Sequence, residues 1–271
     1  MTAGAYHRPP EEYARSRAFS PEAEAQVADS LARLIPPGRR VADLGAGTGR
    51  LAHMLLARGY PVVAYDLSRR MLAYLEQHRP KSRVPLRTIQ GELERLPFAQ
   101  RAFAAAVCVH VLHLLSDWRL GLVEALRIVE PDGTLLFGWT DHVQDDPTRR
   151  ISSKWKEILS ERGLPRSNSL SIRDEVVPWL RDHGWPAREV IAAHWTRERS
   201  PQEHLDQVEA GLYPFFREIP EAAFPEVFSE LRSWAERTLA PLDRAVCTPV
   251  SFQWLVVSIP RSGAPGTPRG T

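Results

Sequence analysis

The chain has 271 residues, of which 43% are hydrophobic and 25% charged, so it carries enough apolar side chains for a packed core. Its 35 basic and 33 acidic side chains leave a net charge of +2. This charge is too small to produce an overall electrostatic field that attracts nucleic acid or an anionic membrane. Cys108 and Cys247 each fall inside an expected strand. We interpret both as small core residues rather than as a disulfide or a metal pair.

The sequence contains no apolar run of the roughly 18 to 20 residues that a membrane helix needs. The longest run, residues 102–115, is interrupted by two histidines. The first residues are polar and lack the apolar region of a secretion signal, so we expect a cytoplasmic protein without membrane insertion. Two oligomeric states remain open, a monomer and a homodimer.

Residues 40–140 repeat a short apolar strand, a turn and an amphipathic helix, which is typical of a parallel sheet covered on both faces. Ser68 is placed to cap a helix that Pro80 ends. The strands are expected at 40–44, 61–66, 86–90, 104–110 and 133–139, and further helices at 49–58 and 117–129.

A glycine-rich loop, VADLGAGTG at 41–49, lies between the first strand and its helix. Three glycines let the backbone turn sharply and approach a ligand closely. The dinucleotide fingerprint needs a further glycine where Arg50 stands, and no Lys-Ser/Thr pair follows as in a P-loop. Asp43 would repel a pyrophosphate but suits a cationic amine, so the loop disfavours an NAD-dependent oxidoreductase.

Two more acids follow at successive strand ends. Asp66 closes the second strand, where a carboxylate can accept both ribose hydroxyls of an adenosine. Glu92, after the third strand, could accept from an adenine amine while Leu93 packs against the ring. Asp43 thus suits an amine, Asp66 a ribose and Glu92 an adenine, in chain order. This order of acids predicts S-adenosylmethionine (SAM) as the ligand.

These motifs resemble the class I SAM-dependent methyltransferases, in the small-molecule branch similar to the ubiquinone and menaquinone C-methyltransferases. The resemblance covers roughly residues 35–140 and rests on DLGAGTGR, YDLSRRML, GELERLPF, VCVHVLHLLSDW and LRIVEPDG. The chain departs from the family pattern at Glu92, where an Asp is usual, and at Ala104, where an acid commonly begins the fourth strand.

The resemblance implies an α/β fold with a Rossmann-like, doubly wound, seven-stranded and mostly parallel sheet whose last strand is antiparallel. It also implies the cofactor contacts. We predict cofactor binding by Asp43, Gly45, Ala46, Gly47, Gly49, Asp66, Leu67, Glu92, Leu93 and His110.

After residue 145 the pattern changes to helical stretches at 148–162, 172–183 and 221–238, with strands at 188–195 and 250–259. A capping box, Ser200 to Glu203, opens a further helix. The segment between the last two strands is too long for a hairpin, so we expect a cap. Its aromatic side chains are either the cap's core or an acceptor pocket. The expected divisions are an N-terminal arm or lid at 1–35, a SAM-binding core at 36–197, a helical cap at 198–245, a final core strand at 246–260 and a disordered tail at 261–271.

Catalytic candidates follow the fourth and fifth strands, because ligands bind beyond the carboxyl ends of parallel strands. An imidazole can accept a proton near pH 7, so His113 and His142 are candidate bases and Asp141 is a candidate orienting residue. The alternatives are that His113 caps a helix and that Asp141 and His142 form an ordinary polar loop. We expect no metal, since no ligand set has the required spacing.

The favoured function is methyl transfer to a small-molecule acceptor, at oxygen, carbon or nitrogen, by in-line displacement. The alternatives are an RNA or other nucleic-acid methyltransferase and a non-catalytic SAM-binding module. Base-methylating enzymes hold the target amine with an Asn- or Asp-Pro-Pro-Tyr segment, and none follows the fourth strand. Nucleic acid is therefore not an expected partner.

Overall fold

The computed structural model describes residues 9–142, 146–165, 170–211, 216 and 219–261. They form two compact units. The described residues of the first, the sheet unit, fall within Met1–Trp139, Leu170–Ala193 and Phe252–Thr271. Those of the second, the helical unit, fall within Thr140–Ser169 and His194–Ser251.

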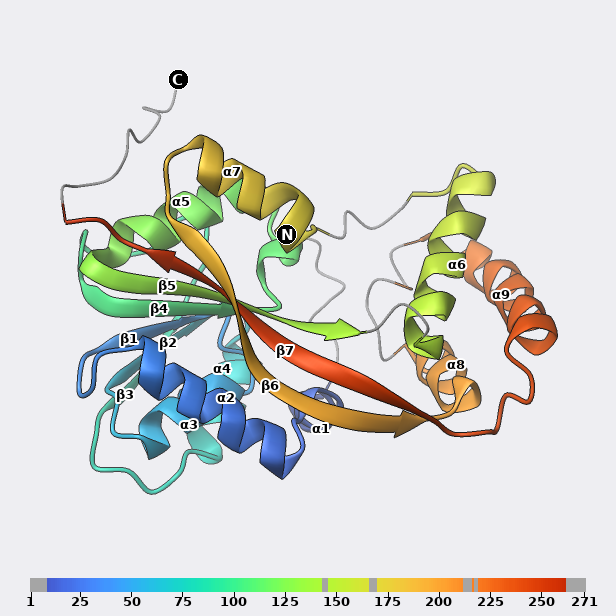
Figure 1. Ribbon diagram of the computed structural model, residues 1–271, viewed down its shortest axis with the longest axis horizontal. Coiled ribbons are helices and arrows are strands. Elements are labelled where there is room, and N and C mark those ends of the chain that lie inside the picture. Colours follow the sequence, from blue (N-terminus) through green and yellow to red (C-terminus); the bar gives the residue numbers. More distant parts are fainter. Residues whose placement is uncertain (1–8, 143–145, 166–169, 212–215, 217–218, 262–271) are drawn as a thin grey trace. The chain divides into compact units, whose positions relative to one another are not determined.

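Seven strands form one sheet in the order β3-β2-β1-β4-β5-β7-β6 (Figure 1). Strands β1 to β5 pair in parallel. The Asp132 N–H donates to the Ile259 carbonyl at 2.9 Å, and the Ile259 N–H donates to the Gly133 carbonyl at 3.0 Å, so the start of β5 meets the end of β7. This antiparallel pairing confirms the expected fold class. The bounds are β1 (Val41–Leu44), β2 (Val62–Asp66), β3 (Leu86–Gln90), β4 (Phe103–Val109), β5 (Val129–His142), β6 (Ala187–Arg199) and β7 (Val246–Ser258).

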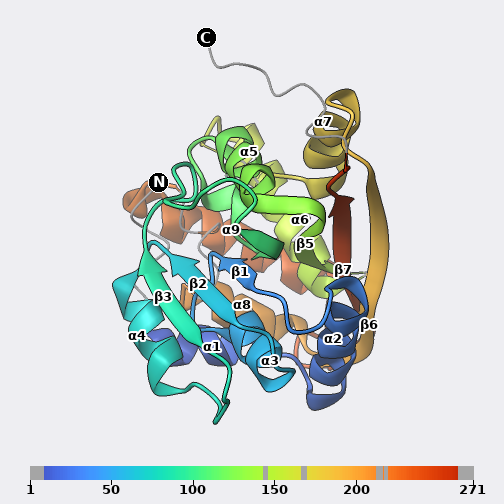
Figure 2. The same cartoon turned by 90° about the vertical axis from the view of Figure 1, so that its left-hand side faces the viewer.

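Helices cover both faces of the parallel strands, with α3 and α4 on one side and α5 on the other (Figure 2). The predicted cap at Ser68 is confirmed, because its side chain accepts from the Met71 N–H. The helices of the sheet unit are α1 (Pro10–Arg17), α2 (Pro21–Leu34), α3 (Arg50–Ala57), α4 (Arg69–Gln77), the single turn Leu112–Leu114, α5 (Trp118–Ile128), the turn Ile172–Val176 and α7 (Val177–Asp182).

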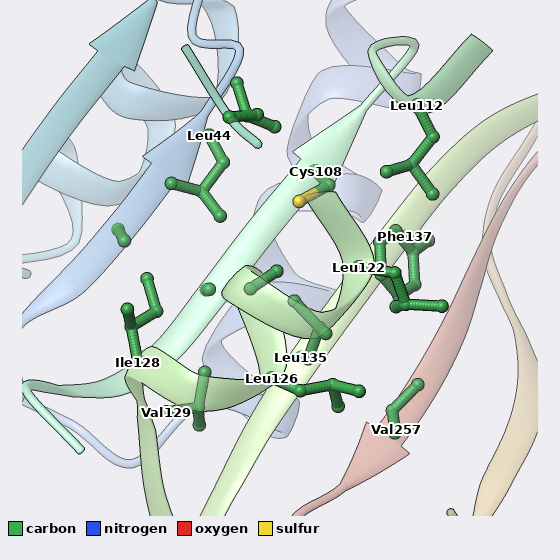
Figure 3. Packing of buried hydrophobic residues seen from close by; sticks show 14 of the residues in the cluster. Leu44, Cys108, Leu112, Leu122, Leu126, Ile128, Val129, Leu135, Phe137 and Val257 are labelled. Carbon is green, nitrogen blue, oxygen red and sulfur yellow. The ribbon is translucent and has the colours of Figure 1, made fainter. Parts of the chain in front are cut away.

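The core of the sheet unit lies on β1 and β4, which are buried almost throughout. Leu44, Cys108 and Phe137 pack there with Leu122 of α5 (Figure 3). Cys108 is thus a core residue as expected. The same expectation is wrong for Cys247, which is exposed. Strand alternation places it on the opposite face of β7 from the buried Thr248.

The helical unit has its own apolar core, built by α6 (Pro147–Glu161), α8 (Pro201–Glu209), the turn Glu221–Ala223 and α9 (Phe224–Thr238). The Trp155 and Phe216 rings lie 5.1 Å apart and those of Phe224 and Phe228 5.5 Å apart. The aromatic stripe of α9 is therefore core. The capping box at Ser200 is present and opens α8.

The helical unit draws on two stretches of the chain, since α6 packs against α8 and α9. The α6 region was expected in the SAM-binding core, and only residues 198–245 were expected in a cap. Tyr213 and Phe215 of that segment and residues 262–271 of the tail lie outside the described residues. Within the described ranges, no helix is both long and apolar enough to span a bilayer.

Candidate functional site

The loop after β1 has the backbone geometry that its glycines allow. Gly45, Gly47 and Gly49 have φ values of +73°, +54° and +90°, a region that other residues rarely adopt. A Cβ on Gly45 would lie 2.5 Å from Val111 Cγ2, and one on Gly49 would overlap Leu75 Cγ. The loop therefore has no room for a side chain at positions 45 and 49, and its positive φ favours glycine at position 47.

A cavity of about 270 Å³ opens in the sheet unit beside this loop. The cavity is surrounded by α1, by the first turns of α2 and α3, by part of α4 and by the residues at the end of β4. Its lining comprises Tyr13, Ala14, Arg17, Ala18, Phe19, Glu24, Asp43, Gly45, Ala46, Gly47, Thr48, Arg50, Leu51, His53, Tyr74, His78, Val109 and His110.

Asp43 belongs to the lining of this cavity and is buried, with 2% of its surface exposed. Its Oδ2 atom has no hydrogen-bond partner among the residues that the structure describes. Desolvation raises the pKa of Asp43 to about 7, and the nearby Asp66 adds to the shift. Because burying an unpaired carboxylate is costly, the site is suited to a ligand that brings a cationic donor.

Asp66 is also buried, but its oxygens already have partners. Oδ2 accepts from the Gly47 N–H and Oδ1 from the Ser68 N–H, each at 2.8 Å. Burial raises the pKa of Asp66, and the two hydrogen bonds oppose that shift. The Asp66 carboxylate at the end of β2 thus holds the backbone of the glycine loop in place through a hydrogen bond to Gly47.

The structure gathers half of the predicted cofactor residues around the cavity: Asp43, Gly45, Ala46, Gly47 and His110. It leaves Gly49, Asp66, Leu67, Glu92 and Leu93 outside the lining. Glu92 is exposed, whereas Leu93 is buried in the core of the sheet unit. Among the lining residues, His110 has a φ of +54°, a strained conformation of the kind that clusters at functional sites.

The candidate base His113 lies on the short turn Leu112–Leu114 after β4. Desolvation by the surrounding atoms lowers its pKa to about 4, with Arg17 adding a like charge, although the side chain keeps an exposed surface. It is therefore neutral at pH 7 and a weak base.

The candidate base His142 ends β5 and belongs to the helical unit. Its Nδ1 lies 3.2 Å from Asp146 Oδ2, and the same buried carboxylate accepts from the Thr148 N–H at 2.7 Å and the Thr248 hydroxyl at 3.1 Å. Burial opposes ionisation of Asp146, but the contacts with His142 and Thr148 outweigh it and hold the pKa well below its usual range.

Asp146 is a residue that the sequence analysis missed. The orienting role was expected for Asp141, which lies half-buried on β5. The available signal was an Asp directly before Pro147, the arrangement of an N-cap followed by proline at the first helical position, and Asp146 does cap α6.

Arg17 and Arg50 are two further cavity residues without a predicted role. The Arg50 Nη1 donates to the Arg17 carbonyl, and its guanidinium lies 4.2 Å from the centroid of the Phe19 ring. Arg50 therefore links the glycine loop to the segment that follows α1.

The sheet order, the glycine loop after β1 and the acid ending β2 define a class I methyltransferase fold. Residues 42–137 match the family model described as a methyltransferase domain. The YcgJ protein of Bacillus subtilis has the same fold, with a TM-score of 0.59 at 17% identity over 88% of this chain and 98% of that one.

Curated relatives are consistent with this fold. A demethylmenaquinone methyltransferase of Paenarthrobacter aurescens is 30% identical over 199 residues, which are 63% of this chain and 74% of that protein. A malonyl-(acyl-carrier protein) O-methyltransferase of Erwinia pyrifoliae is 30% identical over 164 residues, which are 60% of each chain. The chain belongs to the class I SAM-dependent methyltransferases.

Proposed function

We propose that the protein transfers the methyl group of SAM to oxygen, carbon or nitrogen of a small-molecule acceptor by in-line displacement. The observation that carries this proposal is Asp43, a buried residue in the lining of the cavity at the glycine loop, whose Oδ2 has no hydrogen-bond partner among the described residues. A SAM ammonium group would give that oxygen its donor. The sulfonium of SAM supplies a methyl group that is already activated for displacement.

The chain's own residues then bind and orient the cofactor. Asp43 accepts from the amine, Asp66 uses its remaining lone pairs for the ribose hydroxyls, and Glu92 accepts from adenine. The glycine loop, with Ala46, lets the backbone approach closely. Leu67, Leu93 and His110 line the adenosine subsite. Holding the nucleophile in line with the methyl group supplies most of the rate, because alignment replaces a bimolecular encounter.

At most one side-chain base assists, either His113 or His142. A base with a pKa near 4, as at His113, removes a proton poorly at neutral pH. His142 has a buried carboxylate at Nδ1, which favours the tautomer whose Nε2 can accept a proton. We therefore favour His142 as the base, with Asp146 rather than Asp141 as its orienting partner.

The helical unit, including the expected cap at 198–245, selects the acceptor in this proposal. The relatives named above act on demethylmenaquinone and on malonyl-acyl-carrier protein. We propose a small and partly apolar acceptor for this chain. We further propose a cytoplasmic enzyme, monomeric or homodimeric, without a nucleic-acid substrate.

The test combines calorimetry with SAM and NAD and transfer of a labelled methyl group to a panel of acceptors. The panel contains a demethylmenaquinol analogue, a malonyl thioester and total RNA. We expect binding of SAM alone and labelling of a small molecule. Labelling of RNA would overturn the acceptor class, and SAM binding without any labelling would favour a non-catalytic module. Asp43→Asn should weaken SAM binding roughly tenfold to a hundredfold, and the exposed Asp243→Asn is its matched control.

A further inference from the structure

The buried carboxylate of Asp146 has contacts beyond its capping of α6. Its Oδ1 accepts from the Thr148 N–H at 2.7 Å. Its Oδ2 accepts from the Thr248 hydroxyl at 3.1 Å and lies 3.2 Å from His142 Nδ1. Asp146 and Thr248 are both buried, and all four residues belong to the helical unit. One oxygen of Asp146 therefore joins Thr248 to the candidate base His142.

Thr248 reaches Asp146 from a distant part of the chain, because it belongs to β7 and lies 102 residues further on. A carboxylate oxygen can accept more than one hydrogen bond. The Thr248 hydroxyl therefore takes one acceptor site of Oδ2 and leaves another for His142. Thr148 and Thr248 together hold the carboxylate by both of its oxygens. Without the Thr248 hydroxyl, the α6 cap alone would fix the carboxylate, and Oδ2 could turn away from the imidazole.

The direction of these hydrogen bonds determines where the His142 ring carries its proton. The contacts with His142 and Thr148 hold the pKa of Asp146 well below its usual range, so the carboxylate is ionised at pH 7 and can only accept. A neutral imidazole bonds to it only with the proton on Nδ1, which leaves Nε2 as an acceptor. Arg149 Nη1 also donates to the His142 carbonyl at 2.8 Å. The residue is thus held by its backbone and by its ring.

We propose that Thr248 is a positioning residue for the base. Its hydroxyl keeps Asp146 Oδ2 turned toward His142 Nδ1, and the carboxylate in turn keeps Nε2 of His142 free to accept a proton from the acceptor. This assignment rests on the proposed function, because that function gives His142 the role of base. Thr248 itself touches neither the cofactor nor the acceptor in this proposal.

The competing interpretation is that Thr248 only fastens β7 to the start of α6. Removal of its hydroxyl would then lower the melting temperature and leave the His142 ring as it is. If Thr248 acts through Asp146, the same change would alter the proton position on the ring. The two interpretations therefore differ in the state of His142 and not in the loss of stability.

The experiment measures the ¹⁵N shifts of the His142 ring by NMR at pH 8, where an ordinary imidazole is neutral. The variant His142→Gln identifies its signals among those of the nine histidines. In the wild type, Nδ1 should be the protonated nitrogen. In Thr248→Val, the ratio of the Nδ1–H to the Nε2–H tautomer should fall roughly threefold to tenfold, the effect of losing one hydrogen bond.

The second measurement is turnover with the acceptor found in the panel. In Thr248→Val, kcat should fall by the same factor as the tautomer ratio, because only the Nδ1–H tautomer has an Nε2 that accepts a proton. The KM for SAM should stay within about twofold, since a positioning residue of the base does not act on cofactor binding.

Thr248→Ser keeps the hydroxyl and should restore both the wild-type tautomer ratio and kcat. The matched control is Thr196→Val, which removes an exposed hydroxyl from β6 in the same unit. Thermal melting is measured for every variant. Thr248→Cys, whose thiol is a weak donor, replaces Thr248→Val if the valine variant does not fold.

An unchanged tautomer ratio in Thr248→Val would overturn the proposal in favour of a fastening role, as would a changed ratio that Thr248→Ser does not restore. A changed ratio with unchanged kcat would overturn it as well, because the hydrogen bond would then not serve the reaction. Wild-type protein that transfers no methyl group to any acceptor would instead refute the proposed function. The NMR measurement needs no acceptor, so it still decides whether Thr248 orients His142.

Discussion

The Asp66 carboxylate accepts a hydrogen bond from the Gly47 backbone N–H at 2.8 Å, so the acid that ends β2 holds the loop that follows β1. A second bond from the Ser68 N–H fixes the other oxygen. The residue proposed for ribose binding is thus also part of the frame of the cofactor site.

We therefore expect Asp66→Ala to act on both binding and stability. SAM affinity should fall roughly tenfold to a hundredfold, as for the loss of a charged acceptor. The melting temperature should fall too, because the Gly47 and Ser68 N–H groups lose their partner. Calorimetry and thermal unfolding measure the two effects. Unchanged SAM affinity in this variant would contradict the ribose assignment.

Binding of SAM is expected to release a proton below neutral pH. The free protein holds Asp43 with a pKa of about 7, so the carboxyl is largely protonated at pH 6. An ammonium ligand needs the ionised form, and affinity should fall by up to about tenfold per pH unit below that pKa. Calorimetry at pH 6 in two buffers of different ionisation enthalpy detects the proton. A buffer-independent heat would refute this coupling, and Asp43→Asn should abolish it.

Trp155→Ala should destabilise the helical unit without changing the cofactor site. Trp155 is fully buried, and removing such a side chain costs about 3–5 kcal/mol. All residues lining the cavity belong to the sheet unit, so binding of S-adenosylhomocysteine should be unaffected. Urea unfolding and calorimetry check the two statements. The half-buried Trp234→Ala should cost less, and a cost equal to that of Trp155→Ala would argue against this core.

Methyl transfer should depend on Asp146 more than on Asp141. In the Asp146→Asn variant, the asparagine can still cap α6. Its amide cannot hold His142 in the tautomer that leaves Nε2 free to accept a proton. Turnover should therefore fall by roughly 10²- to 10⁴-fold. SAM affinity should not change. The rate is measured with the acceptor found in the panel. Loss of stability with full turnover would show that Asp146 is only a cap.

Asp146 also predicts how stability changes in acid. Its pKa is depressed in the folded protein, so the unfolded chain binds a proton first as the pH falls. The stability that this carboxylate contributes is complete above the ordinary Asp value of 3.8 and is lost below it. Urea unfolding between pH 5 and 3 should show a smaller loss for Asp146→Asn than for the wild type. Equal losses of stability in the variant and the wild type would contradict the depressed pKa of Asp146.

Short-range sequence patterns predicted the strands and helix caps around the site well. Strand β3 has the predicted bounds 86–90, and the Ser68 cap and the Ser200 capping box are present. These features depend on neighbouring residues, through apolar periodicity and side-chain capping, so one stretch of sequence contains all the information they need.

The sequence by itself determined the parallel sheet, the glycine loop and the placement of Asp43 and Asp66 at consecutive strand ends. The tertiary structure alone decided that Cys247 is exposed, that α6 joins the helical core, that Asp146 contacts His142 and that Arg50 meets Arg17 at the cavity. Each of these depends on which face of an element is covered or on a loop path that periodicity does not encode. Contacts such as Thr248 with Asp146, 102 residues apart, form only when the whole chain has folded.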